Sequence, residues 1–419
     1  MNVVNEKAII EKYKTPFYLY DEAQLKERTA LMRAKLPGIG LCFALKAAPV
    51  LAGTLSEMTD RLEVCSPGEY EICIRQGAAP EKLLVSGVNK TNESIKRILE
   101  LGNGKGTYTI ESEEQFNILD KEAAEKGVIL ECYIRLSSGN QFGVDKETLE
   151  KLIAAVNASA NLKLLGIHFF SGTQKNLKRI GSELTELASY GKELSEKFGQ
   201  RFSLEFGPGI GTDYFSTGEA DGRKAELINA EQQLVGLAEL VEESGIREVF
   251  DDITFEYGRF IAAPSAKYYT GVADIKSTFG TNYAILEGGI HQITYYGSMA
   301  GMKVPYINVI PKDDNPGASD NSTSDSSDTE TEEYVLAGSL CSVNDILVRK
   351  AVLPHLCKGD VLSFNLAGAY ALTEGIALFL SRDLPAILIR DSEGNIRLVR
   401  DHMETNPIND GSAGEKVFK

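Results

Sequence analysis

The sequence contains no tryptophan, no long apolar run and no excess of basic charge. Lysine and arginine number 44 against 60 aspartates and glutamates, which gives a formal net charge of -16 at pH 7. A surface this acidic repels nucleic acid and anionic lipid, so we expect neither as a partner. No segment approaches the roughly 18–20 apolar residues that a membrane span needs, and the charged N-terminal stretch MNVVNEKAIIEKYK lacks the apolar core of a signal peptide. We therefore expect a cytoplasmic protein.

Cysteine and histidine are sparse, with six and four residues respectively. No CxxC pair occurs, and no histidine stands at metal-ligand spacing from a cysteine or another histidine. In an intracellular protein such cysteines are expected to be free thiols, and we expect no structural metal.

Eight short apolar runs alternate with amphipathic, helix-like stretches in the first part of the chain, and the length of 419 residues allows two domains. The runs are GLCFALK (40–46), RLEVCS (61–66), KLLVSG (82–87), GTYTIE (106–111), ILECYIRL (129–136), LKLLGIHFF (162–170), FSLEFG (202–207) and DITFEYG (252–258). This alternation predicts an α/β fold, a (β/α)8 TIM-like barrel over residues 25–272.

Strand-like runs separated by turn residues dominate residues 273–419. They predict a C-terminal, mostly antiparallel β domain, which the strand-like TPFYLYD of segment 1–24 would join. Residues 312–333, KDDNPGASDNSTSDSSDTETEE, contain no large apolar side chain and predict a flexible acidic loop. We interpret this loop as a tolerated surface insertion, with a phosphorylation site or a partner dock as the alternative.

Active sites of such barrels form at the carboxyl ends of the strands. Lys46 closes the first strand, where a desolvated amine is a Schiff-base nucleophile; a solvated cap is the alternative. Gly207, Gly209 and Gly211 follow the seventh strand and would let backbone N–H groups approach an anion, with Arg259 as a bidentate donor. The alternative is a plain tight turn and a surface arginine.

Other side chains at the same end suit a ring that contains nitrogen. Glu256 could hold a protonated pyridine nitrogen, Phe170 supplies an aromatic face and Thr173 a hydroxyl donor. His168 is either part of this site or a satisfied core histidine. An amine, an anion cradle, an acid and an aromatic wall together describe a site for pyridoxal 5'-phosphate (PLP).

Seven motifs carry a family resemblance. They are FALKAAP (43–49), EVCSPGEYE (63–71), GIHFFSGTQ (166–174), GPGIG (207–211), EYGR (256–259), LCSVND (340–345) and GAYALTEG (368–375). The chain resembles the fold-type III PLP decarboxylases, the diaminopimelate, ornithine and arginine decarboxylase family with an alanine-racemase-like barrel. The resemblance implies an amino-acid decarboxylase.

The resemblance also implies roles for individual residues. Lys46 would form the covalent link to PLP, Glu63 would be the acid near it, and Gly258 of the EYGR motif would belong to the cofactor site. Tyr370 would contact the phosphate. Cys341 would protonate the α-carbon from the partner subunit of a homodimer with shared active sites.

Departures from the family pattern concern the substrate. Phe170 stands where a second histidine is usual, and Ser342 stands where an acidic residue grips a distal amine. HQITYYG (291–297) lacks the arginine that binds a distal carboxylate. The resemblance makes Ser342, Asp345 and Tyr296 the substrate-contacting residues, without either of the usual clamps.

The substrate is therefore left open between a free amino acid or derivative and an aminoacyl group tethered to an acyl carrier protein, which the FFSGTQ and CSVND versions resemble. Two other functions remain as alternatives. An amino-acid racemase would use Tyr295 or Tyr296 as its base, whereas a silent binding homologue would typically have lost the lysine or the phosphate motif.

Overall fold

A computed structural model of the chain describes residues 6–216, 222–312 and 331–411. The chain divides into two compact units. The barrel unit comprises Leu25–Thr212 and Leu227–Ile261, and the sheet unit comprises Met1–Gln24, Asp213–Glu226 and Ala262–Lys419. The expected boundary after residue 272 falls inside strand β10 (Ala266–Thr278), which pairs with strands of the sheet unit.

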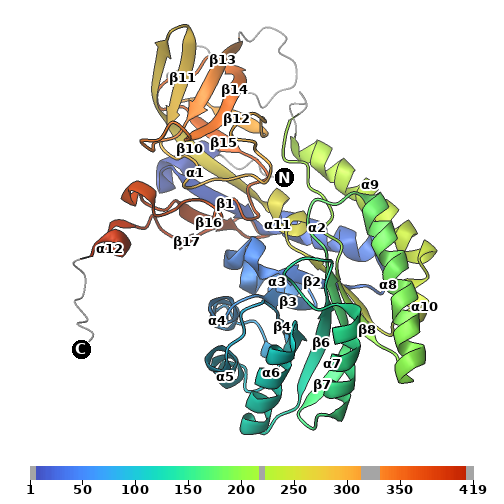
Figure 1. Ribbon diagram of the computed structural model, residues 1–419. Helices are drawn as coiled ribbons and strands as arrows, with labels where there is room; N and C mark the ends of the chain where they lie inside the picture. The colour runs from blue at the N-terminus through green and yellow to red at the C-terminus, as the bar shows by residue number, and fades with distance from the viewer. Residues whose placement is uncertain (1–5, 217–221, 313–330, 412–419) are drawn as a thin grey trace. The chain divides into compact units, whose positions relative to one another are not determined.

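The barrel unit is a closed barrel of eight strands in which every neighbouring pair is parallel, and helices lie around the outside (Figure 1). The strands are β2 (Gly40–Ala44), β3 (Arg61–Val64), β4 (Leu83–Val85), β5 (Thr107–Ile110), β6 (Leu130–Leu136), β7 (Leu162–Phe170), β8 (Ser203–Gly207) and β9 (Ile253–Tyr257). Each coincides with one of the eight apolar runs, so the predicted (β/α)8 barrel is confirmed.

Helices connect the barrel strands, and several begin at a capping side chain. The helices of this part of the chain are α2 (Glu22–Lys35), α3 (Ala52–Met58), α4 (Pro67–Arg75), α5 (Asn92–Leu101), α6 (Glu113–Lys126), α7 (Lys146–Ala158), α8 (Leu177–Phe198), α9 (Gly222–Glu243), α10 (Ile246–Val249) and α11 (Arg259–Ala262). The side chains of Ser66, Thr91, Ser112, Asp145 and Asn176 each accept a hydrogen bond from a backbone N–H in the first turn of the helix that follows. Such caps satisfy donors that a helix start leaves open, and they fix where α4 to α8 begin.

Side chains along the barrel strands alternate between the outside and the interior. The outward positions are buried and apolar, as in Leu41 and Phe43 of β2 or Leu204 and Phe206 of β8. Many inward positions are polar, and contacts that cross the barrel show their direction. These inward residues are Cys42, Arg61, Glu63, Thr109, Tyr133, Arg135, His168, Glu205, Thr254 and Glu256. Because barrels of this class are usually filled by apolar side chains, the polar interior indicates a functional site in this unit.

The sheet unit contains a nine-stranded sheet among its described residues, in the order β14-β13-β11-β10-β1-β16-β17, with β15 pairing with β10 and β12. Besides β10, the strands are β1 (Phe17–Asp21), β11 (Thr281–Leu286), β12 (Ile307–Ile310), β13 (Thr331–Ala337), β14 (Ile346–Pro354), β15 (Val361–Phe364), β16 (Ala386–Arg390) and β17 (Ile396–Arg400). Among the described strand pairs of this unit only β1–β16 and β11–β13 are parallel, which confirms a mostly antiparallel domain. The helices α1 (Glu6–Tyr13) and α12 (Asn406–Asn409) complete the unit.

One core cluster of this unit joins helix α1 to the sheet. Its buried members are Ile9, Phe17, Leu19, Tyr269, Val361, Ala386 and Leu388. The strand-like N-terminal segment is thus part of the sheet, with β1 between β10 and β16. Along the described parts of the chain, no helix has both the length and the apolar character that crossing a membrane requires.

The expected acidic loop needs one correction. Residues 313–330 lie outside the described residues, but Thr331, Glu332 and Glu333 were wrongly assigned to the loop because they open strand β13 and pair with β14. Glu332 is further held by hydrogen bonds from Tyr334 and His355, each of 2.8 Å.

Candidate active site

Lys46 lies in a short 3-10 turn (Leu45–Ala47) directly after β2, with its side chain 40% exposed. Its amine lies 2.7 Å from Oε2 of Glu63 and 3.7 Å from Sγ of Cys65. The hydroxyl of Ser86 donates to the other Glu63 oxygen over 2.5 Å. Burial alone would raise the pKa of Glu63, but the Lys46 amine and these hydrogen bonds outweigh burial and lower that pKa. Glu63 is therefore an ionised partner that orients the Lys46 amine.

Glu256 on β9 faces the barrel interior and is hydrogen-bonded to His168 of β7, with 3.2 Å between Oε2 and the imidazole Nε2. Its Oε1 is buried and has no hydrogen-bond partner among the described residues. A buried carboxylate oxygen without a partner is costly, so it indicates a donor that the protein itself does not supply. His168 is 1% exposed, and its imidazole contacts Glu256 through this hydrogen bond.

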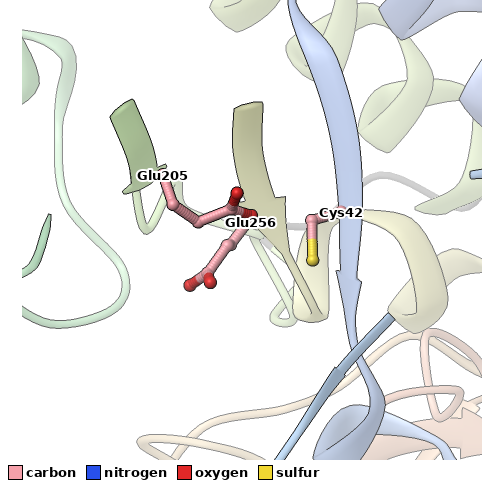
Figure 2. Close-up of side chains that lie close together, drawn as sticks. All are labelled: Cys42, Glu205 and Glu256. Atoms are coloured by element: carbon pink, nitrogen blue, oxygen red, sulfur yellow. The ribbon is translucent and has the colours of Figure 1, made fainter. Parts of the chain in front are cut away.

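A second buried acid, Glu205 of β8, lies beside Glu256. Figure 2 shows the two carboxyl groups next to the Cys42 thiol of β2. One carboxylate oxygen of each acid and Sγ of Cys42 all lie within 4.8 Å of one another. Arg61 of β3 reaches across the barrel and donates to Glu205 over 2.6 Å and to the Tyr133 hydroxyl over 3.1 Å. Polar groups from β2, β3, β6, β8 and β9 thus meet in the interior.

The glycine loop after β8 is joined to the loop after β7. The backbone N–H of Lys175 donates to the Gly209 carbonyl over 2.8 Å. A Cβ on Gly207 would lie 2.5 Å from the Phe170 ring, and one on Gly209 would lie 2.0 Å from the Gly172 carbonyl oxygen. Gly209 also has a φ of +60°, which favours glycine. A Cβ on Gly211 would meet nothing closer than 3.5 Å.

The remaining cofactor candidates of the barrel unit lie at the same strand ends. Gly258 follows β9 directly, and Arg259 opens α11 with a buried side chain. Phe170 ends β7 and Thr173 lies in the segment that follows it, and both are half-buried. The residues predicted from the ends of β2, β7, β8 and β9 are therefore grouped at one end of one barrel.

Five further candidates belong to the sheet unit, and they are described there alone. They are Tyr296, Cys341, Ser342, Asp345 and Tyr370. Cys341 is exposed in the segment between β13 and β14, Ser342 and Tyr370 are half-buried, and Tyr296 is 49% exposed.

Asp345 is buried, and its two carboxylate oxygens accept from the backbone N–H groups of Ile290 and Leu340 over 2.8 and 2.7 Å. These bonds tie down the loop that carries Cys341. The geometry thus gives Asp345 a structural task in this loop.

Sequence reasoning did not single out Arg61, Cys65 or Glu205 at the site. The available signal was the two-residue period of the strands, because Arg61 stands two positions before Glu63 and Cys65 two positions after it. Glu205 likewise stands two positions before Gly207.

Comparisons with known proteins identify the family of this chain. Residues 22–263 match the family model "Pyridoxal-dependent decarboxylase, pyridoxal binding domain". An L-glutamyl-[BtrI acyl-carrier protein] decarboxylase of Niallia circulans is 27% identical over 94% of this chain and 92% of its own length. A diaminopimelate decarboxylase of Pseudomonas aeruginosa is 27% identical over 86% of this chain and 84% of its own.

A crystal structure of diaminopimelate decarboxylase from Helicobacter pylori complexed with L-lysine has the same fold. Its TM-score is 0.78 at 23% identity, and the match covers 96% of this chain and 98% of that chain.

The residues of the barrel suit the cofactor that this family uses. Glu63 orients the Lys46 amine, and a buried oxygen of Glu256 accepts no hydrogen bond from the described residues. The Gly211 backbone is open to close approach, and a buried arginine lies at the start of α11. From the match over 22–263 and this set of residues we conclude that the chain belongs to the pyridoxal-dependent decarboxylases and is an enzyme whose cofactor is PLP.

Proposed function

We propose that this chain removes the α-carboxylate of an amino acid or amino-acid derivative, with Lys46 as the residue that holds PLP. The observation that carries this assignment is the ion pair of 2.7 Å between the Lys46 amine and Glu63 at the end of β2. A nearby carboxylate keeps the amine at a fixed place and assists proton movement to and from it. The family match favours decarboxylation over racemisation on this barrel.

Different residues of the barrel unit would contact different parts of the cofactor. When bound, PLP supplies a ring that accepts the electron pair released as carbon dioxide leaves. Glu256 holds a proton at the pyridine nitrogen, and His168 orients Glu256 through their 3.2 Å hydrogen bond. Phe170 provides an apolar wall and Thr173 a hydroxyl. The loop with Gly207, Gly209 and Gly211 after β8 and the turn with Gly258 and Arg259 after β9 would bind the phosphate.

Cys341 is the proposed general acid that protonates the α-carbon after carbon dioxide has left. Its exposure in a loop of the sheet unit supports a role in the site of a partner subunit, so we propose a homodimer with shared active sites. Asp345 holds this loop in shape through its two backbone hydrogen bonds.

Mixing two inactive variants tests the shared site. In a dimer of Lys46→Ala and Cys341→Ala chains, one of the two sites regains both residues. Random exchange of subunits makes half of the dimers mixed, so we expect about one quarter of the wild-type activity. If the mixture stays as inactive as its components while subunit exchange is demonstrated, the two residues act within one chain or the chain does not dimerise.

The distal part of the substrate carries no charged group in the main proposal, because Ser342 and the segment HQITYYG offer neither of the usual clamps. Losing a charge-assisted contact costs about 1.5–3 kcal/mol, enough to disfavour the doubly charged substrates. A second candidate is an aminoacyl group carried on an acyl carrier protein. It is favoured by the 27% identity to the carrier-protein decarboxylase over nearly the whole chain.

The surroundings of Tyr295, one of the two candidate bases of a racemase, weaken the racemase alternative. The Tyr295 hydroxyl donates to the Asn365 carbonyl over 2.6 Å, and burial raises its pKa, which argues against Tyr295 as a base.

A panel assay tests the function. Purified protein loaded with PLP is offered free L-amino acids and carrier-tethered aminoacyl groups, and carbon dioxide release is measured. We expect release from members without a distal charge, and none in Lys46→Ala. Loss of chirality without gas would instead establish a racemase, and gas release by Lys46→Ala would reject the lysine assignment.

A further inference from the structure

Glu205 has no task in the function proposed above, although its surroundings are unusual. Its side chain is completely buried in the barrel interior, next to Glu256. Arg61 donates to Oε2 of Glu205 over 2.6 Å, whereas Oε1 has no hydrogen-bond partner among the described residues. Two buried carboxyl groups therefore lie together, each with one oxygen that is not hydrogen-bonded, and a single arginine contacts one of them.

The simplest explanation is that Arg61 and Glu205 form a structural ion pair. A buried ion pair is a weak source of stability, because well-packed apolar residues of similar volume are often as good or better. That explanation also leaves open why the pair stands beside the acid that faces the cofactor ring. A role in the charge of this site accounts for both points.

The charged groups around Glu256 can be counted from the structure. Cys42 and Tyr133 stay neutral, because burial, reinforced by the adjacent acids, raises the pKa of the Cys42 thiol and raises the pKa of Tyr133 to about 12. The Lys46 and Glu63 pair balances itself at the end of β2. Arg135 pairs with Glu111 over 3.2 Å, and burial lowers the pKa of Lys90 to about 8. Among the described residues next to Glu256 this leaves Arg61 and Glu205, with His168 as the hydrogen-bond partner of Glu256.

Without cofactor, burial and the charge of Glu256 raise the pKa of Glu205, which favours a proton on Glu205. One proton on the pair leaves one negative charge opposite Arg61, and the interior is neutral. When the pyridine nitrogen takes up a proton, both acids can be ionised, and two negative charges face Arg61 and the ring. The interior is again neutral.

We propose that Glu205 is a positioning residue that acts through Glu256, and that its carboxylate balances Arg61 so that the pyridine nitrogen of PLP can carry a proton. This inference rests on the proposed function, in which Glu256 faces the ring nitrogen. The transfer is balanced: one proton leaves the Glu205 and Glu256 pair and binds the lone pair of the ring nitrogen. Without Glu205, protonating the ring would leave an unbalanced positive charge in a buried site.

The test is the ¹⁵N chemical shift of ¹⁵N-labelled PLP bound to the full chain, followed as a function of pH, because this shift reports protonation of the ring nitrogen and not activity. In Glu205→Gln we expect the apparent pKa of the ring nitrogen to fall by about one to two pH units, the size expected for one unbalanced charge at this depth. Arg61→Met with Glu205→Gln removes both charges and should restore the wild-type shift. If the single and double variants behave alike, charge balance is not the cause and the inference is rejected.

Two controls separate this inference from the proposed function. Arg135→Met with Glu111→Gln removes both charges of another buried ion pair of the barrel, Arg135 to Glu111 at 3.2 Å, and should leave the ring-nitrogen shift unchanged. Glu256→Gln should lower ring protonation more than any other variant. A wild-type shift in Glu256→Gln would reject the proposed role of Glu256, whereas a change there with a wild-type shift in Glu205→Gln would reject only the role of Glu205.

Infrared difference spectroscopy of the wild-type protein covers the case in which Glu205→Gln does not fold. Addition of PLP should remove the carbonyl stretch of one buried, protonated carboxyl group. A spectrum without this loss would overturn the proposal.

Discussion

The three glycines of the loop after β8 should respond very differently to alanine. In Gly209→Ala, the new Cβ would lie 2.0 Å from the backbone oxygen of Gly172, and the residue would keep a φ of +60°. The left-handed conformation alone costs about 1–2 kcal/mol, and overpacking against backbone adds about 1–3 kcal/mol. In Gly207→Ala, the Cβ would lie 2.5 Å from the Phe170 ring, a side chain that can shift, so we expect only the overpacking cost. In Gly211→Ala, the nearest atom would be 3.5 Å away, and stability should change by less than about 0.5 kcal/mol.

PLP titration by absorbance, together with urea unfolding, measures both consequences. Because 1.4 kcal/mol corresponds to a factor of ten, a cost of about 1–3 kcal/mol on the PLP-binding conformation of the loop should raise the dissociation constant of PLP about 5- to 140-fold in Gly207→Ala, and more in Gly209→Ala. A smaller side chain at the neighbouring position, as in Gly207→Ala with Phe170→Leu, should recover part of the loss. If Gly207→Ala and Gly209→Ala unfold at the wild-type urea concentration and bind PLP as tightly as the wild type, loop packing is the wrong explanation.

Three further predictions concern other parts of the molecule. Burial lowers the pKa of Lys90 from 10.5 to about 8, so between these pH values the unfolded chain binds one more proton than the folded chain, and stability rises with pH. In urea unfolding, the wild type should gain about 3 kcal/mol over this window relative to Lys90→Met. Equal pH profiles of the two proteins would contradict this assignment. Arg135→Met should cost about 3–5 kcal/mol because it leaves Glu111 charged and buried, and the double variant with Glu111→Leu should recover most of this loss, which thermal unfolding would reveal. Asp345→Ala should lower carbon dioxide release while PLP absorbance stays normal, because it releases the loop that carries Cys341; unchanged turnover would show that the loop needs no such support.

Much of the fold follows from local patterns. The eight barrel strands alternate with capped helices, and the positions of Ser66, Thr91 and Ser112 explain where α4, α5 and α6 begin. β12 was not predicted, because it is only four residues long and stands between prolines, with its main-chain partners on β15 far along the chain. Thr331 to Glu333 read as loop from composition, yet pairing with β14 makes them strand.

The candidate site likewise contains residues that the sequence predicted and residues that it did not. Lys46, Glu63 and Glu256 could be predicted because each stands at a strand end or in a recognisable motif. For Arg61 and Glu205 the strand period indicated inward side chains but not their pairing, which joins β3 to β8 across the barrel, 144 positions apart in sequence. Asp345 was predicted as a substrate contact from its motif, whereas the structural task of its two oxygens became visible only from the backbone groups they bind.

Chemical trapping of the cofactor tests the central assignment most directly. The PLP-loaded protein is reduced with borohydride and digested, and the labelled peptide is identified by mass spectrometry. We expect one pyridoxyl group per chain, on the peptide that contains Lys46. A label on Lys90 or Lys175, or none at all in protein that retains bound PLP, would contradict the account.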